Sequence, residues 1–428
     1  MNYNGPTIVI DNGSYTTKAG FASEELPQMV FSSVYGQAPD TNGEIIIGDD
    51  QLLSNPSVEV MTLLDDGFIY NFDGVTRNWS HVYQHLDNGA EVNSNEYPLM
   101  LTEEPWNTLK NKVTATQLAF ETFEVPLFSL VKTPLAQLYQ TGKSSGLVID
   151  IGAATTSVTP ILDGIIQSKA SFHTKYGGDF LNLHIAHYFK GQIADMNQLI
   201  PKAFQSSPSS MQNYYITRNI IHDFKVSNTP DYYQLASKNH INVNGFSYID
   251  NLFTPSHHSL PGVEIPMPVL EKPETQGLLD LVFSSLKALE STCMPAINGD
   301  NNTPNRFARF NEILKSILSN VLITGGTSLT PGLSELLILE MRKISPNYFS
   351  SYGFNQYYIQ PVINHQSGDI NEIWEKLFGG WKGASSLATM LNDTNDDSNG
   401  TNIALENWFI TKADYQEQGE DLIAEKFK

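Results

Sequence analysis

The sequence predicts an α/β protein made of two similar halves that face each other across a cleft. A run of apolar residues that ends in an aspartate and a nearby glycine occurs twice, at Thr7–Gly13 and Leu147–Gly152. Each copy is followed by two further strand-like segments, and a later apolar strand ends at the pair Gly325-Gly326. Repetition of one strand-and-turn unit indicates two homologous halves.

The segments that follow each copy have the pattern of an antiparallel meander. They are Thr16–Ala22 and Gln28–Val34 after the first copy, and Thr155–Leu162 and Ile165–Phe172 after the second. The second copy turns through Asp163-Gly164, a dipeptide typical of two-residue hairpins because both positions tolerate positive φ.

Helices alternate with strands in the rest of the chain. Residues Asn107–Phe123 carry apolar side chains at helical spacing, which predicts an amphipathic helix. A short apolar strand, Val125–Val131, follows it, and Pro134 marks the start of another helix. The late strand at Asn320–Thr324 leads through its glycine pair into a helix with apolar periodicity from Leu333. This alternation indicates the α/β class, and the strand, glycine and helix order is typical of a turn that faces an anion or a nucleotide.

Composition limits the classes of protein to which the chain can belong. Its 428 residues suffice for two or three globular domains. A single cysteine, Cys293, excludes an intramolecular disulfide framework and a cysteine-based zinc site, which favours a reducing compartment. The net charge of −21 disfavours direct contact with nucleic-acid phosphates and favours a basic protein partner, with solubility as the alternative explanation of the charge. Apolar runs are too short for a membrane span, so we expect no membrane association.

Asp11 and Asp150 are the candidate metal ligands. A carboxylate at a strand end, followed by a glycine turn, can hold a hydrated Mg²⁺ and present backbone N–H groups to phosphates. Glycine is required because a side chain would block the approach of the backbone. Two such motifs together with Gly325-Gly326 predict a nucleotide cleft. The alternative is that these glycines only make tight hairpins.

Motifs spread over the whole chain follow one family pattern. They are Asp11-Asn12-Gly13-Ser14 with Lys18, Tyr97–Glu103, Phe120–Pro126, Gly146–Gly152, Gly177–Leu181, Thr324–Thr327 with Pro331-Gly332, and Trp381–Ser385. On these residues the sequence resembles actin and the actin-related proteins along nearly its whole length. The stretches Val9–Ser33 and Gly142–Asp179 look most like the subfamily of fungal actin-related protein seven, whose members belong to the SWI/SNF and RSC chromatin remodellers.

The resemblance implies an actin-like fold, with two homologous ribonuclease-H-like lobes around a nucleotide cleft. Residues 1–141 would form the small lobe, to which residues 375–428 would return. Residues 142–374 would form the large lobe, with an inserted subdomain at about 178–270.

The resemblance also implies which residues would hold a nucleotide. The phosphate loops, the adenine-side lysine and the adenosine loop of the family correspond to Asp11, Gly13, Ser14, Lys18, Asp150, Gly152, Lys225, Gly325, Gly326 and Thr327. The cofactor would be ATP. Mg²⁺ would be present only with the nucleotide, near Asp11 and Asp150.

Departures from the family pattern argue against ATP hydrolysis. By alignment, the glutamine and the histidine that order the attacking water in actin correspond to Thr133 and Ser157, and an aspartate that supports the metal corresponds to Ala153. Tyr15 replaces a small glycine beside the phosphate site, and Val226 replaces an acidic neighbour of the adenine-side lysine. Loss of a water-positioning group typically removes ~10² to 10⁴ of rate. We therefore expect no catalytic residue and no enzymatic activity, with either weak binding of unhydrolysed ATP or an empty cleft.

The resemblance further implies protein partners. A groove at the base of the lobes would contain Tyr139, Gln140, Gly142 and Trp381, and in nuclear actin-related proteins this groove receives the basic helicase-SANT-associated helix of a remodeller ATPase. The expected role is an architectural subunit in the nucleus that forms a heterodimer with a second actin-related protein and contacts chromatin only indirectly. For Tyr139 and Trp381, ordinary core packing is the alternative.

Two other functions stay open at this point. The first is an active ATPase or sugar kinase of the wider actin superfamily, which Thr133, Ser157 and Ala153 disfavour. The second is a filament-forming cytoskeletal actin, which insertions near Ser206 and Asp396 disfavour because they would project from surfaces that filament contacts require flat.

Overall fold

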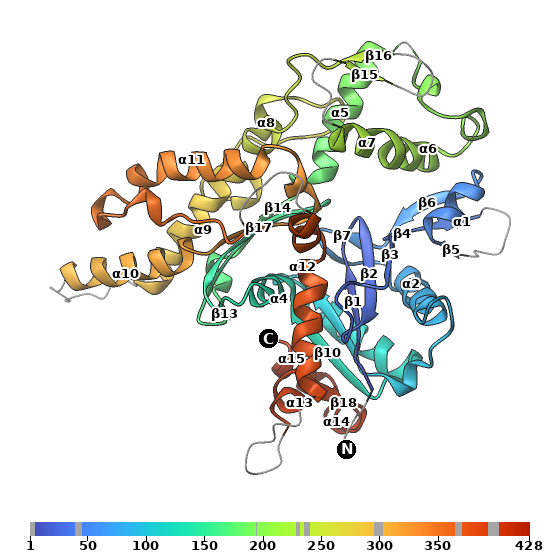
Figure 1. Ribbon diagram of the computed structural model, residues 1–428, viewed down its shortest axis with the longest axis horizontal. Coiled ribbons are helices and arrows are strands. Elements are labelled where there is room, and N and C mark those ends of the chain that lie inside the picture. Colours follow the sequence, from blue (N-terminus) through green and yellow to red (C-terminus); the bar gives the residue numbers. More distant parts are fainter. Residues whose placement is uncertain are drawn as a thin grey trace.

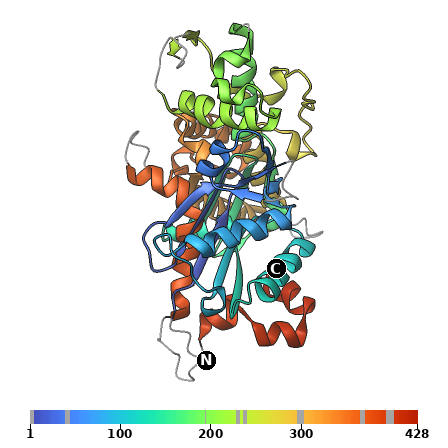
Figure 2. The ribbon, with the colours of Figure 1, turned by 90° about the vertical axis from the view of Figure 1, so that its right-hand side faces the viewer.

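The chain folds into two lobes around a central cleft (Figure 1). The computed structural model describes residues 5–38, 45–193, 195–227, 232–234, 240–294, 303–363, 370–392 and 402–428. Figure 2 shows one outlying subdomain, into which α5 (Gly178–Gln192) extends, at one end of the molecule and the N-terminus at the other. The predicted α/β class and the predicted two-lobed arrangement, with a central sheet in each lobe, are confirmed.

The small lobe is built on a mixed sheet with the strand order β18-β10-β9-β1-β2-β3. Its strands are β1 (Ile8–Asn12), β2 (Thr16–Phe21), β3 (Met29–Ser32), β9 (Leu99–Glu103), β10 (Leu127–Lys132) and β18 (Ile410–Thr411). The first copy of the repeated motif forms β1, which pairs antiparallel with β2 and parallel with β9. Its apolar residues are buried on both faces, as continuous apolar strands require.

The large lobe repeats this plan in the order β13-β12-β11-β17, with β14 paired to β12. Its strands are β11 (Gly146–Ile151), β12 (Thr156–Leu162), β13 (Ile165–Ile166), β14 (Phe172–Thr174) and β17 (Val321–Thr324). The second copy of the motif forms β11, antiparallel to β12 and parallel to β17, just as β1 lies between β2 and β9. The predicted hairpin is present, since Asp163 and Gly164 have φ of 50° and 77°.

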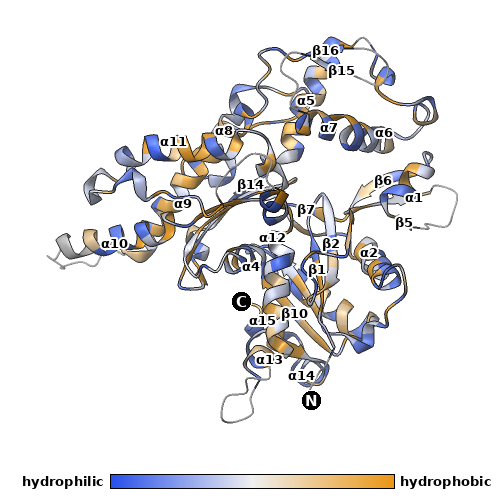
Figure 3. Ribbon diagram, in the orientation of Figure 1, coloured by the Kyte–Doolittle hydropathy of each residue, from blue (hydrophilic) through white to orange (hydrophobic). Residues whose placement is uncertain are grey.

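Helices pack on both sheets. They are α2 (Phe72–His85), α3 (Leu109–Gln117) and α4 (Thr133–Gln140), then α5 (Gly178–Gln192), α9 (Leu278–Cys293), α10 (Thr303–Leu318) and α11 (Leu333–Tyr348), and finally α12 (Ile370–Thr389), α13 (Ile403–Trp408), α14 (Lys412–Gln418) and α15 (Glu420–Lys426). The helix predicted between the motif copies is therefore present, and a π-helical turn at Leu118–Thr122 continues it. The sheets at the centres of both lobes are largely hydrophobic (Figure 3).

Each lobe also carries an outlying subdomain. The small lobe's subdomain contains β4 (Val34–Gln37), β5 (Ile45–Ile47), α1 (Asp49–Ser54), β6 (Glu59–Thr62) and the hairpin β7 (Leu64–Asp65) to β8 (Phe68–Ile69). The large lobe's contains α6 (Ser209–Ile216), α7 (His222–Val226), β15 (Tyr232–Gln234), β16 (His240–Asn242) and, toward the lobe body, α8 (Asp250–Phe253). One hydrophobic cluster joins both subdomains, from Leu52 and Val58 to residues within 185–243.

The predicted end of the inserted subdomain and the predicted return to the small lobe both fall among core or helical residues of the structure. Leu252 and Leu260 belong to the core of the large lobe, although the inserted subdomain was expected to extend to about residue 270. Residue 375, the expected return point to the small lobe, lies inside α12. Ser206 is exposed just before α6, whereas residue 396 lies outside the described residues.

The crossing of α4 and α12 joins the two lobes. These helices lie side by side at the centre of Figure 1. A Cβ added at Gly383 of α12 would lie 1.9 Å from the carbonyl oxygen of Ala136 in α4. Trp381 is fully buried beside this contact, and its Nε1 donates to the carbonyl oxygen of Val9, 3.1 Å away. The two helix backbones therefore approach as closely as a residue without a side chain allows.

Gly383→Ala is expected to lower the free energy of unfolding by about 1–3 kcal/mol or more, because overpacking of a tight contact has this effect. Chemical denaturation followed by circular dichroism measures the change. Gly191→Ala is the matched control. Gly191 lies in α5 with no heavy atom within 4 Å of an added Cβ, so helix propensity should leave stability unchanged or raise it by up to about 1 kcal/mol. Equal effects of the two substitutions would contradict the close crossing.

Candidate functional site

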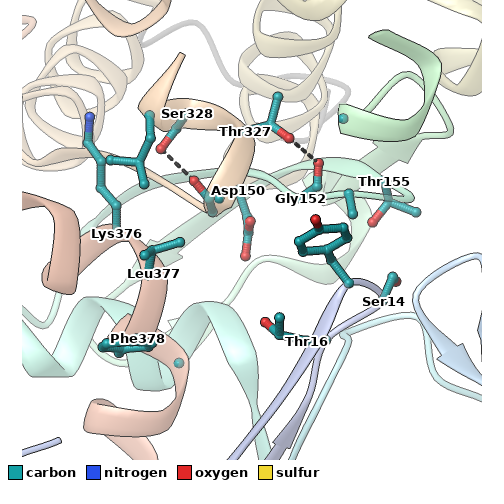
Figure 4. A pocket seen from close by; sticks show the side chains of 18 of the residues that line it. Ser14, Thr16, Asp150, Gly152, Thr155, Thr327, Ser328, Lys376, Leu377 and Phe378 are labelled. Atoms are coloured by element: carbon teal, nitrogen blue, oxygen red, sulfur yellow. Dashed lines mark hydrogen bonds between the residues drawn. The ribbon is translucent and has the colours of Figure 1, made fainter. Parts of the chain in front are cut away.

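A cleft of about 900 Å³ separates the lobes, a volume typical of a small-molecule site. All ten residues predicted to bind nucleotide line it: Asp11, Gly13, Ser14, Lys18, Asp150, Gly152, Lys225, Gly325, Gly326 and Thr327. Figure 4 shows part of this wall, including the hydrogen bond from Thr327 Oγ1 to the carbonyl oxygen of Gly152 at 2.8 Å. Residues far apart in the sequence therefore meet in one cavity.

The two motif copies form matching turns at the cleft. The backbone N–H of Gly13 donates to the carbonyl oxygen of Thr16 at 3.2 Å, and that of Gly152 donates to Thr155 at 2.9 Å. A Cβ at Gly13 would lie 3.0 Å from the Thr16 oxygen, and one at Gly152 would lie 3.1 Å from the Thr155 oxygen. A side chain would fill both turns, so their backbones remain open toward the cavity. This geometry fits a phosphate cradle.

The two aspartates are held by neighbouring side chains. Asp11 pairs with Lys18 at 3.2 Å and accepts a hydrogen bond from Thr102 Oγ1 at 2.6 Å. Asp150 Oδ2 accepts from Gln137 Nε2 at 2.6 Å. Burial raises the pKa of Asp150, while the hydrogen bond from Gln137 and the charge of Lys18 oppose that shift. These carboxylates fit Mg²⁺ by donor type. Among the described residues, however, no group of three or more histidine, cysteine, aspartate or glutamate side chains could hold a metal ion by itself.

Gln137, on helix α4, is a cleft residue that the sequence analysis did not identify. The expected position, Thr133, lines the cleft, but its hydroxyl donates to the carbonyl oxygen of Glu103 at 3.1 Å. Gln137 lies one turn further along α4 on the same face, and it reaches Asp150. Its Oε1 is buried and has no hydrogen-bond partner among the described residues. The linker helix therefore brings a glutamine to the cleft four residues after the aligned position.

Glu104 is a cleft residue that the sequence analysis missed. It follows β9, whose carboxyl end lies beside that of the parallel strand β1, and it lines the cavity. Burial raises its pKa well above the ordinary value, and the carboxylates of Asp150, Asp11 and Glu103 add to this shift. The available signal was the acidic pair directly after a strand that ends at the same sheet edge as Asp11. Ser157 and Ala153 also line the cleft, as the alignment implied.

Tyr15 turns toward the large lobe. Its ring stacks on His222 with centroids 6.0 Å apart, and Arg218 Cζ lies 4.6 Å from its centroid. Burial raises the pKa of Tyr15, against the nearby charge of Arg218. Tyr15 therefore lines the cleft as expected, with its ring engaged by the opposite wall.

Lys225, the lysine that the resemblance places beside the adenine, lines the cleft. Lys225 Nζ donates to Asn182 Oδ1 at 3.0 Å, and its neighbour Val226 is 67% exposed. Burial lowers the pKa of Lys225 to about 8, although the Asp179 carboxylate opposes the shift. The side wall thus offers an amine that is easily deprotonated.

The residues predicted for the basal groove do not share one environment. Tyr139 is partly buried, and its hydroxyl would lie 2.5 Å from a Cβ at Gly164. Gln140 Nε2 donates to Glu375 Oε2 at 2.6 Å, and Gly142 is exposed. Trp381 is wholly buried, so its assignment as a partner-contacting residue is wrong and the alternative of core packing is correct.

Two further expectations concern the chain as a whole. No helix in the described part of the chain has both the length and the apolar character needed to cross a membrane. The described cysteine Cys293 is free.

Comparison with known proteins identifies the family pattern. The family model described as actin matches residues 3–248 and 308–428. Actin-related protein 4 of Yarrowia lipolytica is 25% identical, over 98% of this chain and 95% of its own. The SWI/SNF and RSC complexes subunit arp42 of Schizosaccharomyces pombe is 28% identical, over 79% and 85%. Actin-related protein 7 of Saccharomyces cerevisiae is 35% identical, over 53% and 49%. The resemblance stated from the motifs is confirmed.

On the neutral fraction of the amine, Lys225 is expected to react with a small acylating reagent at least about fiftyfold faster than an ordinary lysine near pH 8, and exposed Lys202 is the reference site. At that pH about half of a group with a pKa of about 8 is neutral, whereas an ordinary lysine is less than about 1% neutral. Peptide mass spectrometry after brief acetylation measures both sites. The Lys225 rate should level off above pH 9. A Lys225 rate that rises in parallel with that of Lys202 up to pH 10 would contradict the lowered pKa.

Proposed function

The chain belongs to the actin family, and from this premise we propose that it is a non-catalytic, architectural subunit of a nuclear ATP-dependent chromatin-remodelling complex. The observation that carries the proposal is its similarity over most of its length to relatives named as actin-related proteins, one of them a SWI/SNF and RSC subunit. The shorter match to actin-related protein 7 supports the same assignment.

In this proposal the chain pairs with a second actin-related protein and binds the helicase-SANT-associated helix of the remodeller ATPase. Tyr139, Gln140 and Gly142 would contact that helix in the basal groove. Ile165, next to the Gly164 that Tyr139 touches, is 66% exposed and adds apolar surface. The net charge of −21 suits a lysine- and arginine-rich helix. Trp381 would support the groove from inside.

The proposed cofactor is ATP, weakly bound and not hydrolysed. The glycine turns and Lys18 would receive the phosphates, Asp11 and Asp150 would support Mg²⁺ that arrives with the nucleotide, and Lys225 would lie toward the adenine. Ala153 offers no polar side-chain group, and Ser157 offers only a hydroxyl in place of the imidazole that orders the attacking water in actin. The amide N–H of Gln137 is engaged by Asp150, which restrains the side chain that could act in their place.

An active ATPase is the second candidate function. The unpartnered Oε1 of Gln137 favours it, since a buried acceptor on a residue that lines the cavity could orient a water molecule. Glu104 adds a carboxylate with a raised pKa beside the two aspartates. Measurement of turnover distinguishes the two candidates.

Affinity purification of the tagged full chain with mass spectrometry tests the proposed role. Recovery of a remodeller ATPase and a second actin-related protein is the expected result. Recovery of cytoskeletal proteins without any remodeller subunit would overturn the proposal.

The purified protein is expected to hydrolyse ATP no faster than background. Phosphate release at steady state measures this rate, with actin as the positive reference and Gln137→Ala and Asp150→Ala as variants. Turnover comparable to that of actin, lost in both variants, would establish the second candidate. If Gln137 positions the attacking water, Gln137→Ala should lower the rate of phosphate release by ~10² to 10⁴, because loss of a water-positioning group typically has this effect.

Mg²⁺–ATP is expected to raise the melting temperature without being consumed. Binding to the folded state alone stabilises it by about 2.7 kcal/mol at a hundredfold excess over Kd. Differential scanning fluorimetry should detect the shift in the wild type and no shift in Asp11→Ala, each compared with its own ligand-free sample. Absence of a shift at millimolar ATP in the wild type would indicate an empty cleft.

Tyr139→Asp is expected to weaken binding of the ATPase helix by ~2 kcal/mol or more if Tyr139 anchors the interface. Fluorescence anisotropy with the labelled helix and the actin-related protein pair measures the affinity, which should also fall with salt because screening shortens the reach of charge. Tyr70→Asp is the control, since Tyr70 is an exposed tyrosine of the small lobe's outlying subdomain. Unchanged affinity of folded Tyr139→Asp would place the interface on another face.

A further inference from the structure

Asp49 connects the two lobes through Arg218, which also contacts the cleft residue Tyr15. It lies in the first turn of α1, in the small lobe. Its Oδ2 accepts a charge-assisted hydrogen bond from Arg218 at 2.7 Å, and its Oδ1 accepts one from the Tyr214 hydroxyl. Both partners come from the large lobe, on α6 and the turn that follows it. Ser32 of the small lobe also donates to Asp49, so this carboxylate is fixed from both sides.

The aromatic ring of Tyr15, also in the small lobe, contacts the guanidinium of the same arginine. The Arg218 guanidinium lies 4.6 Å from the Tyr15 ring centroid, within the range of a cation–π contact. Its charge therefore lies between a carboxylate and an aromatic face that both belong to the small lobe. The side chains of Arg218 and Asp49 are 21% and 30% exposed, so solvent screens this pair less than a surface pair.

Apolar packing and a backbone hydrogen bond extend this contact. Leu52 and Val58 of the small lobe are buried in one cluster with Met211 of α6. The backbone N–H of Val60 donates to Ser210 Oγ at 3.1 Å. The outlying subdomains of the two lobes therefore touch through charged, aromatic, apolar and backbone groups together.

A second contact joins the lobes at the β7–β8 turn. His173 of β14, in the large lobe, stacks on Trp106 with centroids 3.9 Å apart and planes inclined by 7°. Its Nε2 lies 3.3 Å from Asp66 Oδ2, and Trp106 Nε1 donates to the Asp66 carbonyl oxygen at 2.8 Å. Gly67, next in this turn, lines the cleft. Each contact therefore includes or adjoins a residue that lines the cleft, Tyr15 in the first and Gly67 in the second.

We propose that these two contacts form an interlobe latch that holds the cleft closed by the chain's own residues, so that closure requires no nucleotide. Exchange of a ligand between the cleft and solvent then requires the Asp49–Arg218 side to open. The role of Tyr15 in the latch is the cation–π contact with Arg218, which a glycine at that position could not make. The latch is independent of the proposed remodeller role, because it concerns contacts within the full chain.

Spin labels on the two lobes test the latch directly. Gln84 on α2 and Lys190 on α5 are exposed and lie in different lobes, and replacement of Cys293, the one cysteine in the sequence, leaves a clean background. The triple variant Gln84→Cys, Lys190→Cys, Cys293→Ala carries one spin label on each lobe. Pulsed electron–electron double resonance should give one narrow distribution of the distance between the two labels without nucleotide, and Mg²⁺–ATP should leave it unchanged. Asp49→Asn and Arg218→Gln should each add a longer-distance population. A tenfold rise in that population corresponds to about 1.4 kcal/mol.

Lys343→Gln is the control, because it removes a lysine whose ion pair with Glu340 lies within α11; it should leave the distribution unchanged. Tyr15→Gly tests the aromatic half of the latch and keeps both charges, so it remains informative if either charge variant fails to fold. The proposal is overturned if the wild type is broadly distributed without nucleotide and narrows only with Mg²⁺–ATP. It is also overturned if folded Asp49→Asn, Arg218→Gln and Tyr15→Gly all keep the narrow distribution.

Discussion

The close crossing of α4 and α12 is the constraint on which the rest of the structure depends. Glycines on one helix face let α12 lie against both lobes: a Cβ at Gly383 would meet the α4 backbone, and one at Gly380 would lie 3.6 Å from Asp11 Oδ2. A Cβ at Gly379 would lie 3.7 Å from Gln137 Cγ. Because one helix touches the carboxylate of one lobe and the glutamine that holds the carboxylate of the other, its position sets the geometry of the cleft floor.

Sequence patterns predicted the parts of this protein that are local. The repeated strand and turn, the Asp163-Gly164 hairpin and the aspartate–glycine turns of the cleft depend on short motifs whose backbone geometry follows from residue type, whereas the full set of ten cleft residues was implied by the family resemblance. Gln137 was missed for a different reason. An alignment compares positions, whereas a helix presents residues four apart on the same face, so the glutamine of the turn after Thr133 can reach the same place.

Trp381 and Glu104 show the other limit of sequence reasoning. A conspicuous tryptophan in a family motif suits a groove and a core equally well, and burial depends on which helix covers it. Glu104 required knowledge that β9 lies parallel and adjacent to β1, a pairing between segments about ninety residues apart. Burial raises the pKa of Glu104, and its carboxylate shares the cleft with Asp11 and Asp150, which raise that pKa further. Such mutual repulsion favours a bound cation or a proton in this cleft.

The cleft and the proposed basal groove would share their structural supports. Helix α4 brings Gln137 to the cleft, and two and three residues later it carries Tyr139 and Gln140, of which Gln140 donates to Glu375 of α12. Any rotation of the lobes that widens the cleft would therefore move the proposed groove as well, because the same two helices would line both. A latch built from Asp49, Arg218 and Tyr15 would fix the groove at one width regardless of nucleotide. An actin fold could then serve as a rigid platform for a helical partner after its cleft chemistry had weakened.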